Sequence, residues 1–159
     1  MKFESILGPI WLDADQSALS CVSYTPIEEN SLANQEILQT AKNQLTEFLA
    51  GERKAFDLPY VFQIGTDFQQ EVWQALTEIP YGETCSYLDV AKKIERPKAV
   101  RAIGQANRNN PLPIIVPCHR VIGKNGKLVG YSGSSEAGLK IKEQLLAIEN
   151  PMLQEITLF

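Results

Sequence analysis

The sequence predicts an α/β protein of two domains, and three observations support this. Residues 1–62 hold short apolar segments around polar turns and then a long amphipathic segment, which indicates a small α/β domain with antiparallel strands and a helix. Residues 63–159 hold several short segments at helical spacing, which indicates a mainly helical domain. Within it, an apolar strand-like run at residues 114–117 ends at a proline and leads to Cys118 and His119, the one histidine of the chain.

The elements of the first domain follow from its turns and its periodicity. Residues 11–15 and 19–24 are strand candidates on either side of a polar turn. A helix is expected over residues 31–50, where apolar residues recur at amphipathic spacing, and Gly51 stands at the cap position after it. Residues 56–65 contain a proline and are interpreted as the connection to the second domain.

The second domain is predicted to carry a helix-turn-helix. Thr66 begins a capping-box pattern, and residues at helical spacing follow it. Ser86 begins a second such pattern, which predicts a short helix over residues 86–94. Pro97 suits the first position of a further helix over residues 97–107. Two short helices joined by a tight turn are typical of the helix-turn-helix.

The charge of the chain is unevenly distributed. The formal net charge is −4, but residues 92–127 carry nine basic residues and one acidic residue, a local net of +8. At 100° per residue, one face of the helix expected over residues 97–107 carries Lys98, Arg101, Gln105 and Arg108. The opposite face carries Ala99, Val100, Ile103 and Ala106. This pattern predicts a face that binds a polyanion, and a merely solvated basic surface is the alternative.

The Cys118–His119 pair is the candidate reactive centre. A free thiol with a pKa of about 8.5 is only slightly ionised at neutral pH, so a nucleophilic cysteine needs a proton acceptor or a positive charge nearby. His119 and Arg120 are both candidates for this role. Glu149, at the end of a helix expected over residues 136–149, is placed to orient the histidine. The alternative is a buried, unreactive cysteine beside a chance histidine.

The three cysteines are an odd number without CxxC spacing, and with one histidine they do not form the usual zinc sites. They indicate free thiols in a reducing compartment. No secretory signal and no membrane-spanning run are visible, so an intracellular location is expected.

Several separated motifs together resemble the O6-alkylguanine-DNA alkyltransferases, or methylated-DNA–protein-cysteine methyltransferases. The central motif is Pro117-Cys118-His119-Arg120, with Asn110-Pro111-Leu112-Pro113 before it and Tyr131-Ser132-Gly133 after it. The likeness extends over residues 66–149 and is looser in the first third of the chain. The resemblance implies a ribonuclease H-like support domain over residues 1–62 and a DNA-binding and alkyl-transfer domain over residues 63–159.

The resemblance also implies a reaction and its residues. Cys118 would take the alkyl group of O6-alkylguanine, with O4-alkylthymine left open as a substrate, in a single irreversible turnover. His119 would accept the thiol proton through a water, and Glu149 would hold the imidazole. Two further catalytic candidates are Asn110, which would brace the turn before the cysteine, and Tyr87, which would rotate the phosphate or hydrogen-bond the guanine.

Binding roles are implied as well. The damaged nucleotide would be flipped out through the minor groove of double-stranded DNA, and Arg101 would fill the gap that it leaves. The implied DNA-contacting residues are Arg101, Lys98, Gln105, Arg108, Ser86, Tyr87 and Arg120. The implied pocket residues are Val121, Tyr131, Ser132, Gly133 and Pro113.

The remaining expectations concern partners and alternatives. The first domain has only Cys21 as a metal-ligating cysteine and no histidine, so neither a metal nor a cofactor is expected. A monomer is expected, in the cytoplasm, or in the nucleus if the source is eukaryotic. One alternative function is a non-catalytic sensor of alkylated DNA, against which Cys118 argues. The other is a cysteine hydrolase, for which adjacent Cys and His are unusual and the basic helix has no purpose.

Overall fold

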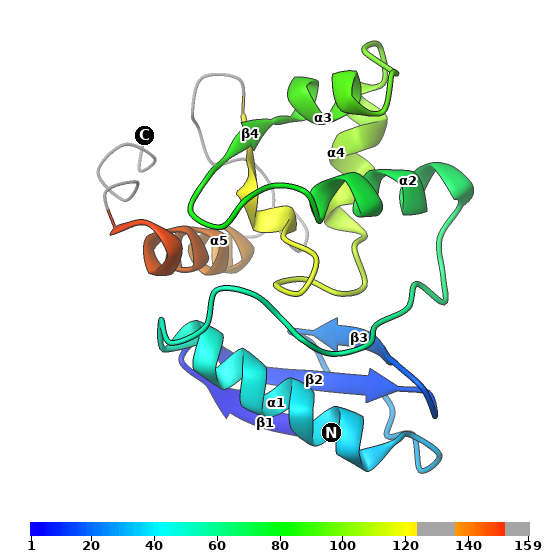
Figure 1. Cartoon of the computed structure of the whole chain (residues 1–159), viewed down its shortest axis with the longest axis vertical. Coiled ribbons are helices and arrows are strands. Elements are labelled where there is room, and N and C mark those ends of the chain that lie inside the picture. Colours follow the sequence, from blue (N-terminus) through cyan, green and yellow to red (C-terminus); the bar gives the residue numbers. More distant parts are fainter. Residues whose placement is uncertain (124–135, 152–159) are drawn as a thin grey trace. The chain divides into compact units, whose positions relative to one another are not determined.

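The structure is a computed structural model that describes residues 1–123 and 136–151, and these form two compact units (Figure 1). The first unit comprises Met1–Ile64 and Pro111–Ile115, and the second comprises Gly65–Asn110 and the described residues from Val116 onward. The predicted fold class is confirmed, because the first unit holds an antiparallel sheet with one helix and the second is mainly helical. No described helix combines the length and the apolar character that crossing a membrane requires.

Three antiparallel strands form the sheet of the first unit in the order β1-β2-β3. They are β1 (Lys2–Ser5), β2 (Gly8–Ala14) and β3 (Leu19–Ser23). Ile10, Leu12 and Ala14 of β2 are buried, because alternate side chains of a strand point to the same face. The strand predicted over residues 11–15 begins earlier, at Gly8, and β3 lies where a strand was expected. Strand β1 was not predicted, because its one buried residue, Phe3, gives no alternation to recognise.

Helix α1 (Gln35–Leu49) packs against this sheet. It begins later than the predicted helix over residues 31–50, because the side chain of Asn34 caps it by accepting from the N–H groups of Glu36 and Ile37 at 3.0 and 3.2 Å. Gly51 follows the helix with φ +78°, a conformation that suits glycine. The apolar stripe that the helix buries consists of Leu38, Ala41, Leu45, Phe48 and Leu49.

Three helices pack together in the second unit. They are α2 (Asp67–Leu76), α3 (Tyr87–Lys93) and α4 (Val100–Arg108). Both predicted capping boxes are present, with Thr66 and Ser86 as the capping residues. Helices α3 and α4 form the predicted helix-turn-helix. The buried indole N–H of Trp73, on α2, donates to the carbonyl oxygen of Ala106, on α4, at 2.7 Å.

Helix α4 begins three residues after its predicted start at Pro97. Helix α3 ends at Lys93, and Glu95, two residues later, has a φ of +61°. A turn follows in which the Ala99 N–H donates to the Arg96 carbonyl at 2.9 Å. Pro97 therefore lies in this turn. The proline rule located the break between the helices correctly, but a turn that depends on Glu95 has no clear sequence signal.

A short parallel ladder and a last helix complete the second unit. Strand β4 (Cys85–Ser86) pairs with β5 (Val121–Ile122). Helix α5 (Glu136–Glu149) has the bounds predicted from the sequence, and it packs against the turn that holds Cys118.

Gly65, in the second unit, has no room for a side chain. Its φ is +103°, and an added Cβ would lie 2.5 Å from two ring carbons of Trp73. The buried indole is also held by Ala106, so it cannot move aside without losing its hydrogen bond.

We therefore predict that Gly65→Ala destabilises the protein by about 2–5 kcal/mol, from backbone strain of about 1–2 kcal/mol and overpacking of about 1–3 kcal/mol. Gly8→Ala is the control, because Gly8 has φ +100° and its added Cβ would meet nothing within 4 Å. Urea unfolding of the two variants measures the difference. Equal losses of stability would contradict the packing of Trp73 against Gly65.

Candidate active site and DNA-binding surface

Cys118 opens a 3₁₀ turn, η1 (Cys118–Arg120), whereas the sequence analysis placed it at the end of a strand. Ile114 has a φ of +75°, and Ile114 and Ile115 lie in a turn, so the predicted strand-like run does not form a strand. The Cys118 N–H then donates to the carbonyl of Val116 at 2.8 Å, and β5 begins only at Val121. Cys118 and His119 therefore lie in a turn and not in a strand. The cysteine is 3% exposed.

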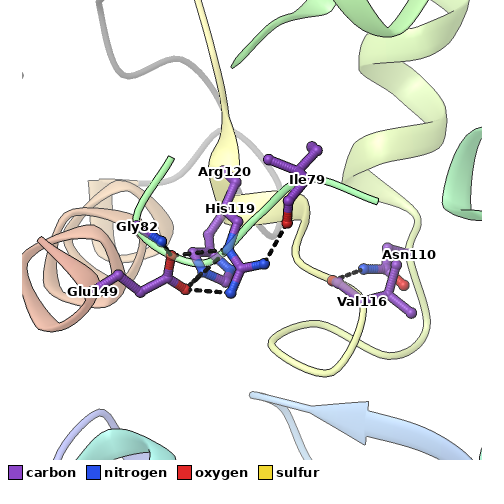
Figure 2. A network of polar contacts seen from close by, with 7 residues as sticks. All are labelled: Ile79, Gly82, Asn110, Val116, His119, Arg120 and Glu149. Carbon is purple, nitrogen blue, oxygen red and sulfur yellow. Dashed lines mark hydrogen bonds and ion pairs between the residues drawn. The ribbon is translucent and has the colours of Figure 1, made fainter. Parts of the chain in front are cut away.

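The carboxylate of Glu149 is the centre of a buried polar network (Figure 2). Its Oε2 lies 2.5 Å from His119 Nε2. Arg120 donates to it from Nε, at 2.8 Å to Oε1, and from Nη2, at 2.9 Å to Oε2. The Gly82 N–H donates to Oε1 at 3.1 Å, and Arg120 Nη1 donates to the carbonyl of Ile79 at 2.7 Å. One carboxylate thus holds α5, the turn η1 and the 80–82 turn together.

The protonation of this network follows from its burial and charges. Burial alone would raise the pKa of Glu149, but the hydrogen bonds from His119 and Arg120 and the charge of Arg120 outweigh it and lower the pKa to about 2. Burial lowers the pKa of His119, and the hydrogen bond and charge of Glu149 oppose this only in part. His119 is therefore neutral at pH 7, with its proton on Nε2 facing the carboxylate.

The second ring nitrogen of His119 is left as a proton acceptor. Nδ1 is buried and has no hydrogen-bond partner among residues 1–123 and 136–151. A neutral imidazole that donates from Nε2 carries a lone pair on Nδ1. The geometry therefore provides a base whose tautomer is fixed by Glu149, in the residue next to Cys118.

Asn110 contacts the backbone just before the cysteine. Its Nδ2 donates to the carbonyl oxygen of Val116 at 2.9 Å, as Figure 2 shows. The same oxygen accepts the Cys118 N–H, so the side chain of Asn110 fixes one end of the turn that carries the cysteine.

Tyr87 and Lys142 lie within electrostatic reach of Cys118. Lys142, on α5, is 0% exposed, and its Nζ lies 5.9 Å from the centre of the Tyr87 ring. Burial lowers the pKa of Lys142 to about 8, and the charge of a Cys118 thiolate acts in the opposite direction. Burial raises the pKa of Tyr87 to about 12, so the phenol keeps its proton at neutral pH.

The sequence did not identify Lys142 as a site residue. The one feature that points to it is its position seven residues before Glu149, two helical turns away on the same face of α5. A lysine in an amphipathic helix is usually solvated, so this spacing alone gave no reason to select it.

The predicted basic face is exposed. Its members are Lys98, in the turn before α4, and Arg101, Gln105 and Arg108, on α4. Ile103 and Ala106 are buried on the other side, as predicted, whereas Val100 is 37% exposed because it lies at the first turn of the helix.

Salt bridges neutralise part of the local positive charge. Lys93 pairs with Glu78 at 3.2 Å, and Arg96 pairs with Glu71 at 3.4 Å. Lys98, Arg101 and Arg108 form no salt bridge with any residue that the structure describes. These three side chains are therefore available to an external anion.

Arg120 does not fit the DNA-contacting role that the resemblance implied. It is 7% exposed, its guanidinium is bonded to Glu149 and to the Ile79 carbonyl, and it lies 5.6 Å from the centre of the Tyr81 ring. Its charge compensates the buried carboxylate instead. Ser86, another implied contact, uses its hydroxyl to accept the Asp89 N–H at the start of α3.

The implied pocket is described only in part. Val121 is buried in β5 beside Cys85, and Pro113 is buried in the segment that belongs to the first unit. Tyr131, Ser132 and Gly133 lie outside the described residues. Cys21 and Cys85 are free thiols, and burial raises the pKa of both, that of Cys85 to about 11, so neither is a competing nucleophile.

The network predicts how stability depends on pH. Because the pKa of Glu149 is about 2 in the folded protein against an ordinary 4.5, its charge stabilises the fold above about pH 4.5, and this contribution is lost as the pH falls toward 2. Glu149→Gln leaves Arg120 buried without its counter-charge, so we expect a loss of about 3–5 kcal/mol at pH 7.

Unfolding by urea at pH 7 and at intervals down to pH 3 measures this effect. The difference between the wild type and Glu149→Gln should shrink as the pH falls below 4.5. Glu143→Gln, on the same helix, is the control and should change little. A difference that stays constant with pH would show that Glu149 is not the ionised centre of the network.

Comparison with known proteins places this geometry in a family. Residues 67–151 match the family described as 6-O-methylguanine DNA methyltransferase, DNA binding domain. The methylated-DNA–protein-cysteine methyltransferase of Methanosarcina acetivorans is 48% identical over 153 residues, which cover 92% of this chain and 95% of the relative. The constitutive methylated-DNA–protein-cysteine methyltransferase of Bacillus subtilis is 59% identical over 118 residues, 74% of this chain and 69% of the relative.

Solved structures agree with these relatives. The O6-methylguanine methyltransferase of Mycobacterium tuberculosis matches with a TM-score of 0.82 and 41% identity, over 94% of this chain and 91% of that one. The structure of Mycobacterium tuberculosis OGT in complex with DNA matches with a TM-score of 0.81 and 40% identity, over 98% and 92% of the two chains. From the match to the family and the identity to its members, this chain belongs to the methylated-DNA–protein-cysteine methyltransferases, as its motifs indicated.

Proposed function

We propose that this protein repairs alkylated DNA by moving the alkyl group from O6 of guanine to the sulfur of Cys118. The observation that carries the proposal is the buried series Cys118, His119 and Glu149. Its carboxylate fixes a neutral histidine whose Nδ1 has no hydrogen-bond partner in the described part of the chain. Relatives at 43–59% identity are named for this reaction. O4-alkylthymine is a second candidate substrate of the same chemistry.

Activation of the thiol is assigned to His119 and Lys142. His119 Nδ1 accepts the thiol proton, through a water where the distance requires one, and the imidazolium is stabilised by Glu149. A charged Lys142 favours the thiolate over the thiol, because attraction between two charges is mutual and is strong in a buried site. The proton accepted by His119 leaves a sulfur with a full negative charge.

The transfer itself is an in-line displacement at the alkyl carbon. A bond forms between Cys118 Sγ and that carbon while the bond from the carbon to guanine O6 breaks, and the electron pair stays on the guanine. A proton then restores neutral guanine. The phenol of Tyr87, protonated at neutral pH, is a candidate to relay it, and the proton that His119 took from the thiol balances the step. The product is a thioether without an easy leaving group, so each molecule acts once.

DNA contact is assigned to the exposed face of the helix-turn-helix. Lys98, Arg101 and Arg108 offer three positive charges that described acidic residues do not neutralise, and Gln105 lies among them. Phosphate contacts of this kind weaken as salt rises. Entry through the minor groove and insertion of Arg101 into the space of the flipped nucleotide would suit a protein that recognises damage and not sequence.

The expectations on domains and location stay proposals as well. Residues 1–62 would support the transfer domain, and the protein would act as a monomer inside the cell, in the cytoplasm or, in a eukaryote, in the nucleus. A sensor without transfer activity is disfavoured, because it has no use for a cysteine beside a fixed base.

Intact-mass spectrometry tests the central proposal. After the protein is mixed with a duplex that contains one O6-methylguanine, we expect the mass of one methyl group to be added, and peptide mapping should place it on Cys118. Cys118→Ala should bind the same duplex without gaining mass, whereas Cys85→Ala should be methylated normally. Binding of the lesion without any gain of mass would identify a sensor, and repeated turnover on an ester would identify a hydrolase.

A second experiment tests the role of Arg101 in base flipping. Arg101→Ala should slow transfer from duplex DNA by about 10-fold or more, since flipping costs a few kcal/mol that inserted side chains help to offset. Its rate with a free O6-alkylguanine base, which needs no flipping, should be unchanged. Arg101→Lys separates charge from shape, and Arg53→Ala is a control in the first unit. Equal slowing with the duplex and the free base would contradict the assigned role.

A further inference from the structure

Asn107 is a buried polar residue that neither the motifs nor the proposed reaction uses. It lies in the last turn of α4, on the side opposite the exposed basic face, and is 2% exposed. The next residue, Arg108, points outward. Polar side chains at such positions are normally hydrogen-bonded, so its partners are informative.

The amide of Asn107 contacts the nucleophile directly. Its Nδ2 donates to the carbonyl oxygen of Cys118 at 3.2 Å, and that oxygen also accepts the N–H of Val121. On the other side of the cysteine, Asn110 holds the carbonyl of Val116. Two asparagines, three residues apart, thus hold the carbonyl groups before and at the nucleophile.

The other end of the Asn107 amide is unsatisfied. Its Oδ1 is buried without a hydrogen-bond partner among the residues that the structure describes, and the reverse orientation of the amide would place two oxygens together at Cys118. A buried acceptor without a donor costs about as much as the bond at Nδ2 contributes. The amide of Asn107 therefore does not stabilise the fold more than an apolar side chain of similar size would.

The turn of α4 that holds Asn107 is itself fixed. The preceding residue, Ala106, accepts the indole N–H of Trp73 at 2.7 Å, and Ile103 is buried one turn earlier. The position of Asn107 relative to the exposed side chains of α4 is thus set by a packed helix.

We propose that Asn107 is a positioning residue for the transfer, and that its amide sets the distance between the DNA-binding helix and the sulfur of Cys118. The inference rests on the proposed function. A base presented by α4 must meet the sulfur in line with the breaking bond, and a displacement of about 1 Å in such a site costs on the order of 100-fold in rate. The bond from Asn107 to Cys118 connects the helix that holds the DNA to the residue that reacts.

Asn107→Leu tests this inference, because it removes the donor and keeps an apolar side chain of similar size. With saturating duplex that contains O6-methylguanine, we expect the rate constant of methyl transfer to fall about 10-fold or more, while the Kd for the duplex stays within about twofold. The melting temperature should be unchanged or higher, since an unsatisfied acceptor is removed as well. Asn107→Asp, which keeps the shape without the donor, should lose rate similarly.

Asn109→Leu is the matched control, an exposed asparagine two residues along, and should transfer normally. Hydrogen exchange in the full-length protein without DNA gives a second readout: the Val121 amide should exchange faster in Asn107→Leu than in the wild type. An unchanged transfer rate or unchanged exchange would overturn the inference, as would a loss of rate that merely follows a loss of stability. Absence of transfer in the wild type would instead count against the proposed function, and the exchange would still test the contact.

Discussion

The structure of the site depends on one buried carboxylate. Glu149 is the last residue of α5, yet its two oxygens accept from His119, Arg120 and Gly82, which lie on other segments of the chain. A buried carboxylate is stable only when it is paired and fully hydrogen-bonded, and one of its donors here is the histidine next to Cys118. The contacts that stabilise the buried charge of Glu149 also fix the tautomer of His119. The chemistry of the turn η1 therefore depends on the folding of α5.

Local rules recovered most of the fold. The capping boxes at Thr66 and Ser86 located two helices, because a side chain that satisfies free N–H groups is a property of a few adjacent residues. The sequence also predicted the bounds of α5 and the contact between Glu149 and the histidine. The sequence predicted neither the 3₁₀ turn at Cys118 nor the positive φ of Ile114, a conformation for which that residue type has no preference.

Charge was the property least well predicted. Counting basic residues found the right region, but the count does not distinguish a solvated cation from a buried one. Arg120 belongs to the interior, where it balances a carboxylate, and Lys142, outside the basic region, lies buried near the thiol. Burial depends on tertiary contacts between segments far apart in the sequence, so motif and periodicity give the sign of a charge but not its environment.

Helix α4 carries its packing residues and its exposed polar residues on opposite faces. Its inward side chains, among them Ile103 and Asn107, pack against neighbours or hold the nucleophile, whereas Arg101 and Gln105 face outward. Substitutions on the outer face therefore need no compensating change in the core. In evolution, related proteins could acquire a different nucleic-acid preference by exchanging the exposed side chains of this helix while the reactive centre stays the same. Protein engineers could change the exposed face in the same way.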